Sequence, residues 1–219
     1  MNPVDAITSA GTALVIAPPA SPEEVEQLTT ELGVPLPDEL RAVLAHTTRV
    51  DGSGVGTLDF TGRSMDYEDR DLFPAGLPIA GDGAGNFWVL DVVPGEREQA
   101  AVFFASHDPP VVVYESDGLG GWLARVLEGA APPTELASKA PLLEHGAALV
   151  TGDDELGAFA AALTERFLFA DLRSAEPGLG FEWGRFGPRT EVRRHGFVRL
   201  FALAPPAQRP GGLRRLFRR

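Results

Sequence analysis

Residues able to do chemistry are mostly acidic in this chain, and several of them lie between positions 66 and 91. The densest run is Asp66-Tyr67-Glu68-Asp69-Arg70-Asp71. Carboxylates at this density could contact a basic protein or hold a hard divalent cation, and such a run is equally compatible with a solvated loop. The ligand spacing of an EF-hand calcium loop does not occur in the run. We therefore expect no metal site and interpret the run as a candidate protein contact.

A glycine-rich loop follows the acidic run and leads into an apolar segment. Residues 77–93 read LPIAGDGAGNFWVLDVV. The glycines permit a tight turn, and the aromatic and β-branched residues after it predict a strand. Asp82 and Asn86 can shape the turn through bonds to the backbone, or contact a small ligand or peptide. Asp91 falls inside the apolar segment, so its carboxylate would need a partner if it is buried.

Familiar catalytic and nucleotide-binding motifs do not occur in the sequence. Neither glycine cluster, 52–56 or 81–85, has the Gly-x-Gly-x-x-Gly or Gly-Lys-Ser/Thr pattern that binds phosphate. The four histidines are scattered, and His107-Asp108 is the pair that most suggests catalysis. We expect no catalytic residue and no cofactor. A hydrolase whose Ser/His/Asp triad assembles only in space remains an alternative, although no Gly-x-Ser-x-Gly elbow is present.

The net charge of −12 is distributed unevenly along the 219 residues. Residues 185–219 hold ten arginines and one acidic residue, which gives about +9. Residues 1–184 hold nine basic and thirty acidic side chains, about −21. Such an acidic body repels nucleic acid and attracts basic partners. The last residues, RPGGLRRLFRR, form a basic tail that could contact anionic lipid or nucleic acid, dock on the acidic body or fray.

The composition is that of an ordinary globular protein. Apolar residues make up 44% of the chain and charged residues 23%. Apolar runs are too short to span a bilayer, and the first twenty residues lack the basic start of a secretory signal. Because the sequence contains no cysteine, it offers neither a disulfide framework nor thiolate chemistry. We expect a cytoplasmic protein without a transmembrane segment.

Two short neighbouring helices are predicted near the N-terminus. Residues 21–24, SPEE, form a capping box with proline at the first helical position, and Gly33 suits the end of that helix. A second helix is expected from Pro37, with its apolar face at positions 40, 43 and 44. The linker between them is short, so the two helices should lie close together.

Short apolar runs then predict strands at 57–60, 87–93, 101–105 and 111–115. The connectors 94–100 and 106–110 are too short for crossover helices, so we expect antiparallel hairpins. Ser116 or Asp117 is expected to cap a third helix, whose apolar residues between 119 and 127 recur at helical spacing.

The segment AAPPT, residues 130–134, resembles a joint between two units. We therefore predict a first domain at 1–130 and a C-terminal extension at 131–219 that ends in the basic tail. Within the extension, the pattern predicts a helix with apolar residues from 156 to 167, opened by residues 151–154. Residues 190–203 have the composition of a strand that bends at Gly196.

Several of these pieces occur in a recognisable order along residues 17–129. They are the capped helix, Leu32-Gly33-Val34-Pro35-Leu36-Pro37, the second helix, Leu77-Pro78-Ile79-Ala80, Gly85-Asn86, Val89-Leu90-Asp91 and the helix with Trp122 and Leu123. This ordered set resembles the SUKH superfamily, which includes fungal cell-wall synthesis regulators and bacterial immunity proteins. The Asn-Gly-Gly-like turn usual in that family after the second helix is replaced here by residues 46–52, HTTRVDG.

The resemblance implies an α+β fold with a central, mostly antiparallel sheet and flanking helices, to which the C-terminal α/β extension is added. It also implies a non-enzymatic, protein-binding role. Bacterial members commonly neutralise a cognate toxin, so we expect an immunity protein whose partner is a cognate toxin or another basic protein. A regulatory scaffold that binds endogenous proteins or peptides is the alternative with the same fold.

The expected partner surface combines the acidic run, the glycine-rich loop and the end of the last hairpin strand. Its residues are Asp66, Tyr67, Glu68, Asp69, Asp71, Asp82, Asn86, Glu115 and Asp117. Acidic residues in this surface would speed the encounter with a basic toxin face and set its orientation. Hydrophobic anchors would supply much of the affinity.

Overall fold

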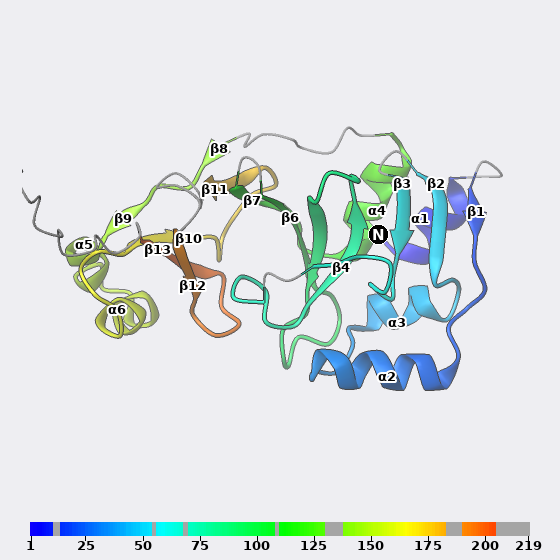
Figure 1. Cartoon of the computed structure of the whole chain (residues 1–219), viewed down its shortest axis with the longest axis horizontal. Helices are drawn as coiled ribbons and strands as arrows, with labels where there is room; N and C mark the ends of the chain where they lie inside the picture. The colour runs from blue at the N-terminus through cyan, green and yellow to red at the C-terminus, as the bar shows by residue number, and fades with distance from the viewer. Residues whose placement is uncertain are drawn as a thin grey trace, which may run out of the picture.

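Thirteen strands and six helices make up the part of the chain that the structure, a computed structural model, describes (Figure 1). The described residues are 1–10, 14–53, 56–67, 70–107, 110–129, 138–182 and 190–204. They form a nine-stranded sheet, a four-stranded sheet and the helices that cover them. Antiparallel pairing dominates both sheets, so the predicted α+β fold is confirmed.

The large sheet contains every strand of residues 1–129 and two strands of the C-terminal extension. In spatial order these are β1 (Val15–Ile16), β2 (Arg49–Ser53), β3 (Gly56–Asp59), β4 (Gly76–Gly81), β5 (Phe87–Asp91), β6 (Ala101–His107), β7 (Pro110–Ser116), β11 (Leu179–Glu182) and β8 (Ser138–Lys139). Among these neighbours, β11 and β8 pair parallel, and the other pairs are antiparallel. The extension therefore lengthens the sheet at the β7 edge.

The second sheet lies wholly within the C-terminal extension. The structure describes residues 138–182 and 190–204 of this extension. The antiparallel order of the second sheet is β12 (Glu191–Arg194), β13 (Leu200–Ala204), β10 (Leu168–Asp171) and β9 (Leu143–Glu144). The helices are α1 (Pro3–Ser9), α2 (Pro22–Leu32), α3 (Asp38–Leu44), α4 (Leu119–Leu127), α5 (His145–Leu149) and α6 (Asp154–Ala161). We call residues 1–129 the N-terminal unit.

The start and end of α2 follow directly from the local sequence. The hydroxyl of Ser21 accepts a bond from the backbone N–H of Glu24 at 3.2 Å, and the Glu24 carboxylate accepts one from the N–H of Ser21 at 2.8 Å. Gly33 ends the helix with φ of 71°, a left-handed conformation that favours glycine. The predicted capping box and C-cap are confirmed.

The start of α4 differs from our prediction, because neither Ser116 nor Asp117 caps it. The helix begins after Gly118. The backbone N–H groups of Leu119 and Gly120 donate hydrogen bonds of 2.7 and 3.4 Å to the carboxylate of Glu39 in α3. A Cβ on Gly118 would lie 2.8 Å from that carboxylate. Glycine at this position therefore lets a distant side chain do the capping.

Helix α1 was not predicted, yet it packs against α4 and α3. Its N-cap is Asn2, whose side chain accepts a bond from the N–H of Val4 at 2.9 Å, and Pro3 occupies the first helical position. A Cβ on Gly120 of α4 would lie 2.0 Å from the carbonyl oxygen of Met1. Glycine in α4 therefore permits the close approach of the N-terminal segment.

One face of the large sheet is covered by α1, α2, α3 and α4. The buried core on this side combines apolar residues of these helices with every second residue of the strands, among them Ile7, Leu28, Leu40, Leu44, Val50, Leu58, Ile79, Trp88, Leu90, Phe104, Val113, Trp122 and Leu123. The rings of Trp88 on β5 and Trp122 on α4 are 6.3 Å apart. This packing explains the helical spacing of the apolar residues in α4.

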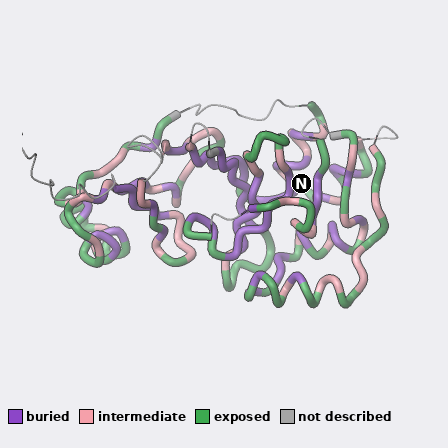
Figure 2. The backbone as a smooth tube through the Cα atoms, in the orientation of Figure 1, coloured by how far each residue is buried: buried purple, intermediate pink, exposed green. Residues whose placement is uncertain are grey.

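The opposite face of β5, β6 and β7 is covered by the C-terminal extension. This second core joins Tyr67, Phe73, Val89, Phe103, Val112 and Tyr114 of the N-terminal unit to Ala170, Phe181, Val192, Phe201 and Leu203 of the extension. Figure 2 shows buried backbone running from the large sheet into the second sheet. The extension and the N-terminal unit thus share one hydrophobic core.

A buried ion pair crosses this shared core. Asp91 of β5 and Arg194 of β12 form two parallel bonds of 2.7 Å, and their side chains are 0% and 1% exposed. Arg194 also donates to the carbonyls of Leu72, Phe197 and Val198 at 3.1, 2.6 and 2.9 Å. Five hydrogen bonds therefore satisfy its guanidinium. The expectation that a buried Asp91 needs a partner is confirmed.

Two predictions for the extension were wrong in detail. The helix predicted across 156–167 ends at Ala161, although Phe167 still belongs to a third core with Leu156 and Phe159. The strand predicted over 190–203 is a hairpin, β12 and β13, and Gly196 lies in its turn with φ of 55°. A turn at the glycine folds the two halves together instead of bending one strand.

Candidate partner-binding surface

The described part of the acidic run divides into exposed carboxylates and a buried ring. Asp66 and Asp71 are exposed, whereas Tyr67 is 8% exposed. Its ring meets that of Phe87 edge-on at 5.5 Å, so Tyr67 anchors the run to the core and is not available as a surface contact. Glu68 and Asp69 lie outside the described residues.

The β4–β5 turn is held in one conformation by its own side chains. The Asp82 carboxylate accepts bonds from the backbone N–H groups of Ala84 and Asn86, at 2.8 and 3.2 Å, and from the Asn86 side chain at 2.6 Å. Burial pushes the pKa of Asp82 upward, but the bonds from Asn86 and Ala84 outweigh it and lower the pKa. Asp82 therefore stays ionised and gives the turn a fixed shape.

A second turn-forming carboxylate positions the residues around Asp66. Asp59, at the end of β3, is 6% exposed and accepts bonds from the N–H and hydroxyl of Thr61 and the N–H of Ser64, at 2.8, 2.6 and 2.9 Å. Burial raises the pKa of Asp59, and the bonds from Ser64 and Thr61 more than reverse that effect. The segment that leads to Asp66 is thereby fixed to the end of β3.

The acidic run and the glycine-rich turn meet at a hollow of about 540 Å³, the β2–β5 hollow. It is lined by Arg49, Thr57, Ser64, Met65, Asp66, Gly81, Gly83, Gly85, Asn86 and Phe87. Arg49 and Thr57 alternate along their strands with Val50 and Leu58 of the helix-side core, so they face away from the helices. The hollow thus lies on the sheet face that the extension covers farther along.

The sequence indicated Asp66 and the loop from Gly81 to Asn86 as parts of a binding surface, but it gave no such indication for the other lining residues, which are Arg49, Thr57, Ser64, Met65 and Phe87. Strand β2 was not predicted, because residues 49–53 are mostly polar or glycine. Phe87 was assigned to a strand without a surface role. Its half-buried environment beside Tyr67 depends on long-range packing. An alternation of polar and apolar residues at 49–51 is the local signal that could have revealed β2.

Glu115 does not lie at the surface. It is 6% exposed and is the extra residue of a β-bulge, since Val102 pairs with Ser116 and Phe103 with Tyr114. Burial raises the pKa of Glu115 to about 7, against the lowering effect of Arg125, whose guanidinium is 3.4 Å from one carboxylate oxygen. The other carboxylate oxygen has no hydrogen-bond partner among the described residues.

Asp117 is exposed, but it lies apart from the β2–β5 hollow. Its carboxylate accepts a hydrogen bond from the hydroxyl of Tyr114 and is 3.7 Å from the guanidinium of Arg199 in the extension. Arg199 also lies over the Tyr114 ring at 5.4 Å. Burial and the bond to Asp117 raise the pKa of Tyr114. Asp117 therefore belongs to the junction between the N-terminal unit and the extension.

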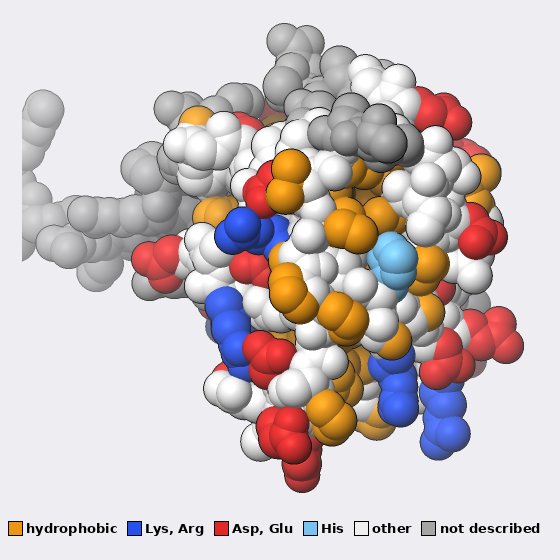
Figure 3. Space-filling model, turned by 90° about the vertical axis from the view of Figure 1, so that its right-hand side faces the viewer, with side chains coloured by type: hydrophobic (Ala, Val, Ile, Leu, Met, Phe, Trp, Pro, Cys, Tyr) orange, Lys and Arg blue, Asp and Glu red, His pale blue; other side chains and the backbone are white. Residues whose placement is uncertain are grey.

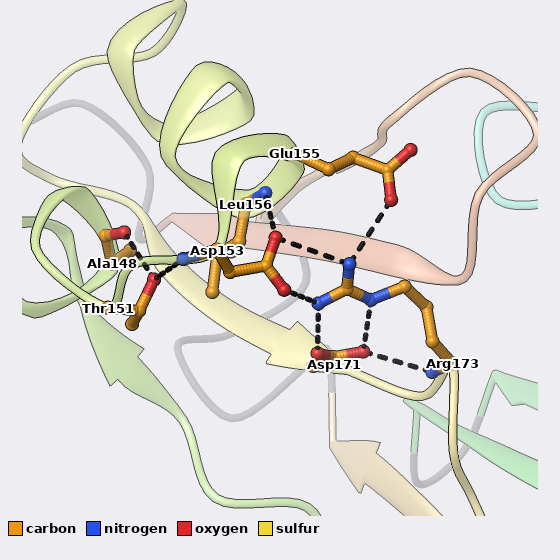
Figure 4. Close-up of polar contacts among 7 residues, drawn as sticks. All are labelled: Ala148, Thr151, Asp153, Glu155, Leu156, Asp171 and Arg173. Atoms are coloured by element: carbon orange, nitrogen blue, oxygen red, sulfur yellow. Dashed lines mark hydrogen bonds and ion pairs between the residues drawn. The ribbon is translucent and has the colours of Figure 1, made fainter.

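The largest described cluster of charged groups surrounds Arg173 in the extension (Figure 4). Its guanidinium bonds Asp171 at 2.6 and 3.0 Å, Glu155 at 3.1 Å and Asp153, which is also the N-cap of α6. We call these four residues the Arg173 cluster. The arginine holds the three carboxylates in place and ties α6 to the end of β10.

Two of the described histidines, His145 and His195, contact other residues of the extension. The Nε2 atom of His145 is 3.0 Å from the carbonyl oxygen of Ala160, and the His195 ring lies 4.8 Å from that of Phe159. The His107 side chain and Asp108 lie outside the described part of the chain. Among the described residues, no group of three or more His, Cys, Asp or Glu side chains could hold a metal ion.

The negative charge is concentrated in the N-terminal unit. Its 129 residues include 21 acidic and six basic side chains. Several acidic side chains are exposed, including Asp66, Asp71, Asp82 and Asp117. Within the described ranges, no helix is both long and apolar enough to cross a membrane.

The fold and this surface define an α+β protein with an acidic N-terminal unit. The family model of the SMI1 / KNR4 family (SUKH-1) matches residues 19–125. Residues 19–125 therefore belong to the SUKH superfamily, and the resemblance noted in the sequence is confirmed. The matched residues include α2, α3 and β2 to β7, and they end within α4. A comparison with curated proteins finds no match to this chain.

Proposed function

We propose that this protein is an immunity protein, a non-enzymatic binding module that neutralises a cognate bacterial toxin by occupying its surface. The observation that carries the proposal is the SUKH-1 match over a unit with 21 acidic and six basic side chains. An excess of one charge on a folded surface accelerates association with an oppositely charged partner and orients it. The proposed partner is therefore a basic protein, and no cofactor takes part.

The proposed contact surface is the exposed part of the acidic run together with the β4–β5 turn. Asp66, Asp71 and Asp82 are exposed, and Asp66 and Asp82 lie beside or within segments fixed by internal hydrogen bonds. A surface that is already ordered loses little conformational entropy on binding, which favours affinity. Tyr67 supports this surface from the interior. Glu115 is buried elsewhere, beside Arg125 of α4, and the exposed carboxylate of Asp117 lies near Arg199 of the extension.

Apolar anchors are also required for tight binding, because exposed ion pairs contribute little by themselves. The end of the molecule that carries β1 has apolar side chains across its middle, with acidic and basic side chains around them (Figure 3). Val15 and Ile16 of this edge strand are 67% and 49% exposed. We propose this end as a second contact region, with residues 1–130 as the binding unit and 131–219 as an extension.

We keep the cytoplasm as the proposed location, because a chain without cysteine needs no oxidising compartment to fold.

The immunity proposal is tested by mixing the full chain with the product of the neighbouring gene at micromolar concentration and low salt. We expect the two proteins to form a stoichiometric complex. We also expect this protein to protect a cell from the toxicity of its partner when both are expressed in that cell. A complex without toxicity in the partner would favour the regulatory scaffold, and no complex would contradict the pairing.

A further inference from the structure

The β2–β5 hollow is the concave part of the acidic surface, and its lining suits one kind of side chain. Its floor and walls combine the half-buried ring of Phe87 with the backbone of Gly81, Gly83 and Gly85. Gly83 and Gly85 have φ of 78° and 87°, so side chains are disfavoured there and the backbone stays accessible. The hollow therefore combines an aromatic side chain with glycines that have no side chain to fill it.

The rim of the hollow is negative even though Arg49 lies in it. The Arg49 guanidinium is paired with Asp51 at 3.0 Å, and the hydroxyl of Thr57 donates to the same aspartate at 2.7 Å. Asp66 is exposed on the rim, and its carboxylate makes no ion pair with another described residue. Asp82 lies ionised in the adjoining turn, so three carboxylates, those of Asp51, Asp66 and Asp82, lie in or beside the hollow with the one guanidinium of Arg49.

We infer that the β2–β5 hollow receives an arginine side chain from the partner, an inference that rests on the proposed function. A guanidinium is planar and donates hydrogen bonds only, so it can stack on the Phe87 ring while it bonds the Asp66 carboxylate. Its aliphatic stem would pass over Met65 and the glycine backbone. A lysine lacks the planar group, and a carboxylate would meet the negative rim.

The fixed turns on both sides of the hollow support this choice of ligand. Asp82 holds one wall through its three bonds, and Asp59 holds the segment before Asp66. Neither wall must reorganise to admit a narrow side chain. Because a preformed site loses little entropy on binding, one arginine can serve as an anchor for a larger contact.

The probe for this inference is N-acetyl-arginine amide, titrated into the full chain labelled with nitrogen-15. We expect chemical-shift changes at residues 64–66 and 81–87 that saturate in the millimolar range. N-acetyl-lysine amide should bind more weakly, and N-acetyl-glutamate amide should leave these signals unchanged. Changes distributed over the whole acidic surface, or equal binding of the lysine probe, would overturn the assignment of arginine.

Two variants make the result specific to the hollow. Asp66→Asn should weaken arginine binding about tenfold, because a charge-assisted bond becomes a neutral one. Phe87→Leu should weaken it through loss of stacking, and the unchanged remainder of the spectrum would show that the fold persists. The matched control is Asp154→Asn, an exposed aspartate of α6 in the extension.

Failure of this inference can be told apart from failure of the proposed function. If a protein partner binds the parent chain and Asp66→Asn equally well, the hollow takes no arginine, while the immunity proposal stands. If the arginine probe binds the hollow but no partner is found beside the gene, the site stands and the pairing fails.

Discussion

Two arginines of the C-terminal extension hold carboxylates in opposite environments. Arg194 is 1% exposed and bonds a single carboxylate, Asp91, across the core that joins the extension to the N-terminal unit. Arg173 is 27% exposed and bonds three carboxylates, all within the extension. The number of ion pairs that an arginine makes is therefore a poor guide to their importance, because burial decides what their loss costs.

The two arginines also connect different parts of the molecule. Arg194 links β12 to β5, so it joins the extension to the sheet of the matched SUKH region. The Arg173 cluster ties α6 to β10 and stays local. Breaking the first should loosen the contact between the two parts, whereas breaking the second should loosen only the far end of the extension.

The largest effect is expected from Arg194→Met, which leaves Asp91 charged and buried without its partner. Loss of one member of a buried pair typically costs about 3–5 kcal/mol of unfolding free energy. Urea denaturation followed by tryptophan fluorescence measures the free energy of unfolding, since Trp88 lies on the same strand as Asp91. The double variant Asp91→Leu with Arg194→Met should recover much of the loss. Surface substitutions typically change the free energy of unfolding by about 0.5 kcal/mol or less. A change that small in Arg194→Met would contradict the claim that the buried pair is costly to break.

Glu115 provides an intermediate case, buried like Arg194 but incompletely bonded. Its pKa is raised to about 7 in the folded protein, so the folded state holds a proton that the unfolded state releases above its ordinary value of 4.5. The Glu115 contribution to stability therefore falls as pH rises from about 4.5 to about 7, by up to roughly 3 kcal/mol. Glu115→Gln should remove this slope. Parallel pH profiles for the parent and the variant would show that burial of Glu115 carries no such penalty.

The smallest stability effect is expected from Arg173→Gln. The pKa values of Asp153 and Asp171 are both lowered, with hydrogen bonds from Arg173 among the causes, but these groups are partly exposed and solvent screens them. We expect a loss of about 1 kcal/mol that shrinks as salt is added. Hydrogen exchange should increase in α6 and leave β5 unchanged. Faster exchange throughout the large sheet would show that the cluster is not local.

Features fixed by neighbouring residues could be predicted from the sequence. The capping box of Ser21 and Glu24, the C-cap at Gly33 and the antiparallel hairpins of the large sheet depend on short segments, and the structure has them as expected. The SUKH resemblance was carried by the same short segments. Their order along the chain supplied the fold class.

Features that depend on distant residues could not be predicted in the same way. Glu39 caps α4 from a position 80 residues away, and Asp91 finds its partner 103 residues along the chain. The sequence required a partner for Asp91 without indicating which arginine would provide it. The pairing of β11 with β7 and of β8 with β11 likewise cannot be predicted from local sequence patterns.

The candidate surface shows the same division. Asp66, Asp82 and Asn86 were identified by composition, but the sequence did not distinguish exposed members of the acidic segments from buried ones. Tyr67 turned inward because its ring packs on Phe87, and Glu115 turned inward because a β-bulge shifts the alternation of β7. Both outcomes depend on packing partners from other strands.

The central claim is that the acidic N-terminal unit binds a basic protein partner through its exposed carboxylates. The most direct measurement is calorimetric titration of the full chain with the product of the neighbouring gene at low and at moderate salt. We predict one-to-one binding that weakens as salt rises and weakens further in an Asp66→Lys and Asp71→Lys double variant, whereas Asp154→Lys binds like the parent. Binding that is absent at low salt, or is equal in the double variant and the parent, would contradict this account.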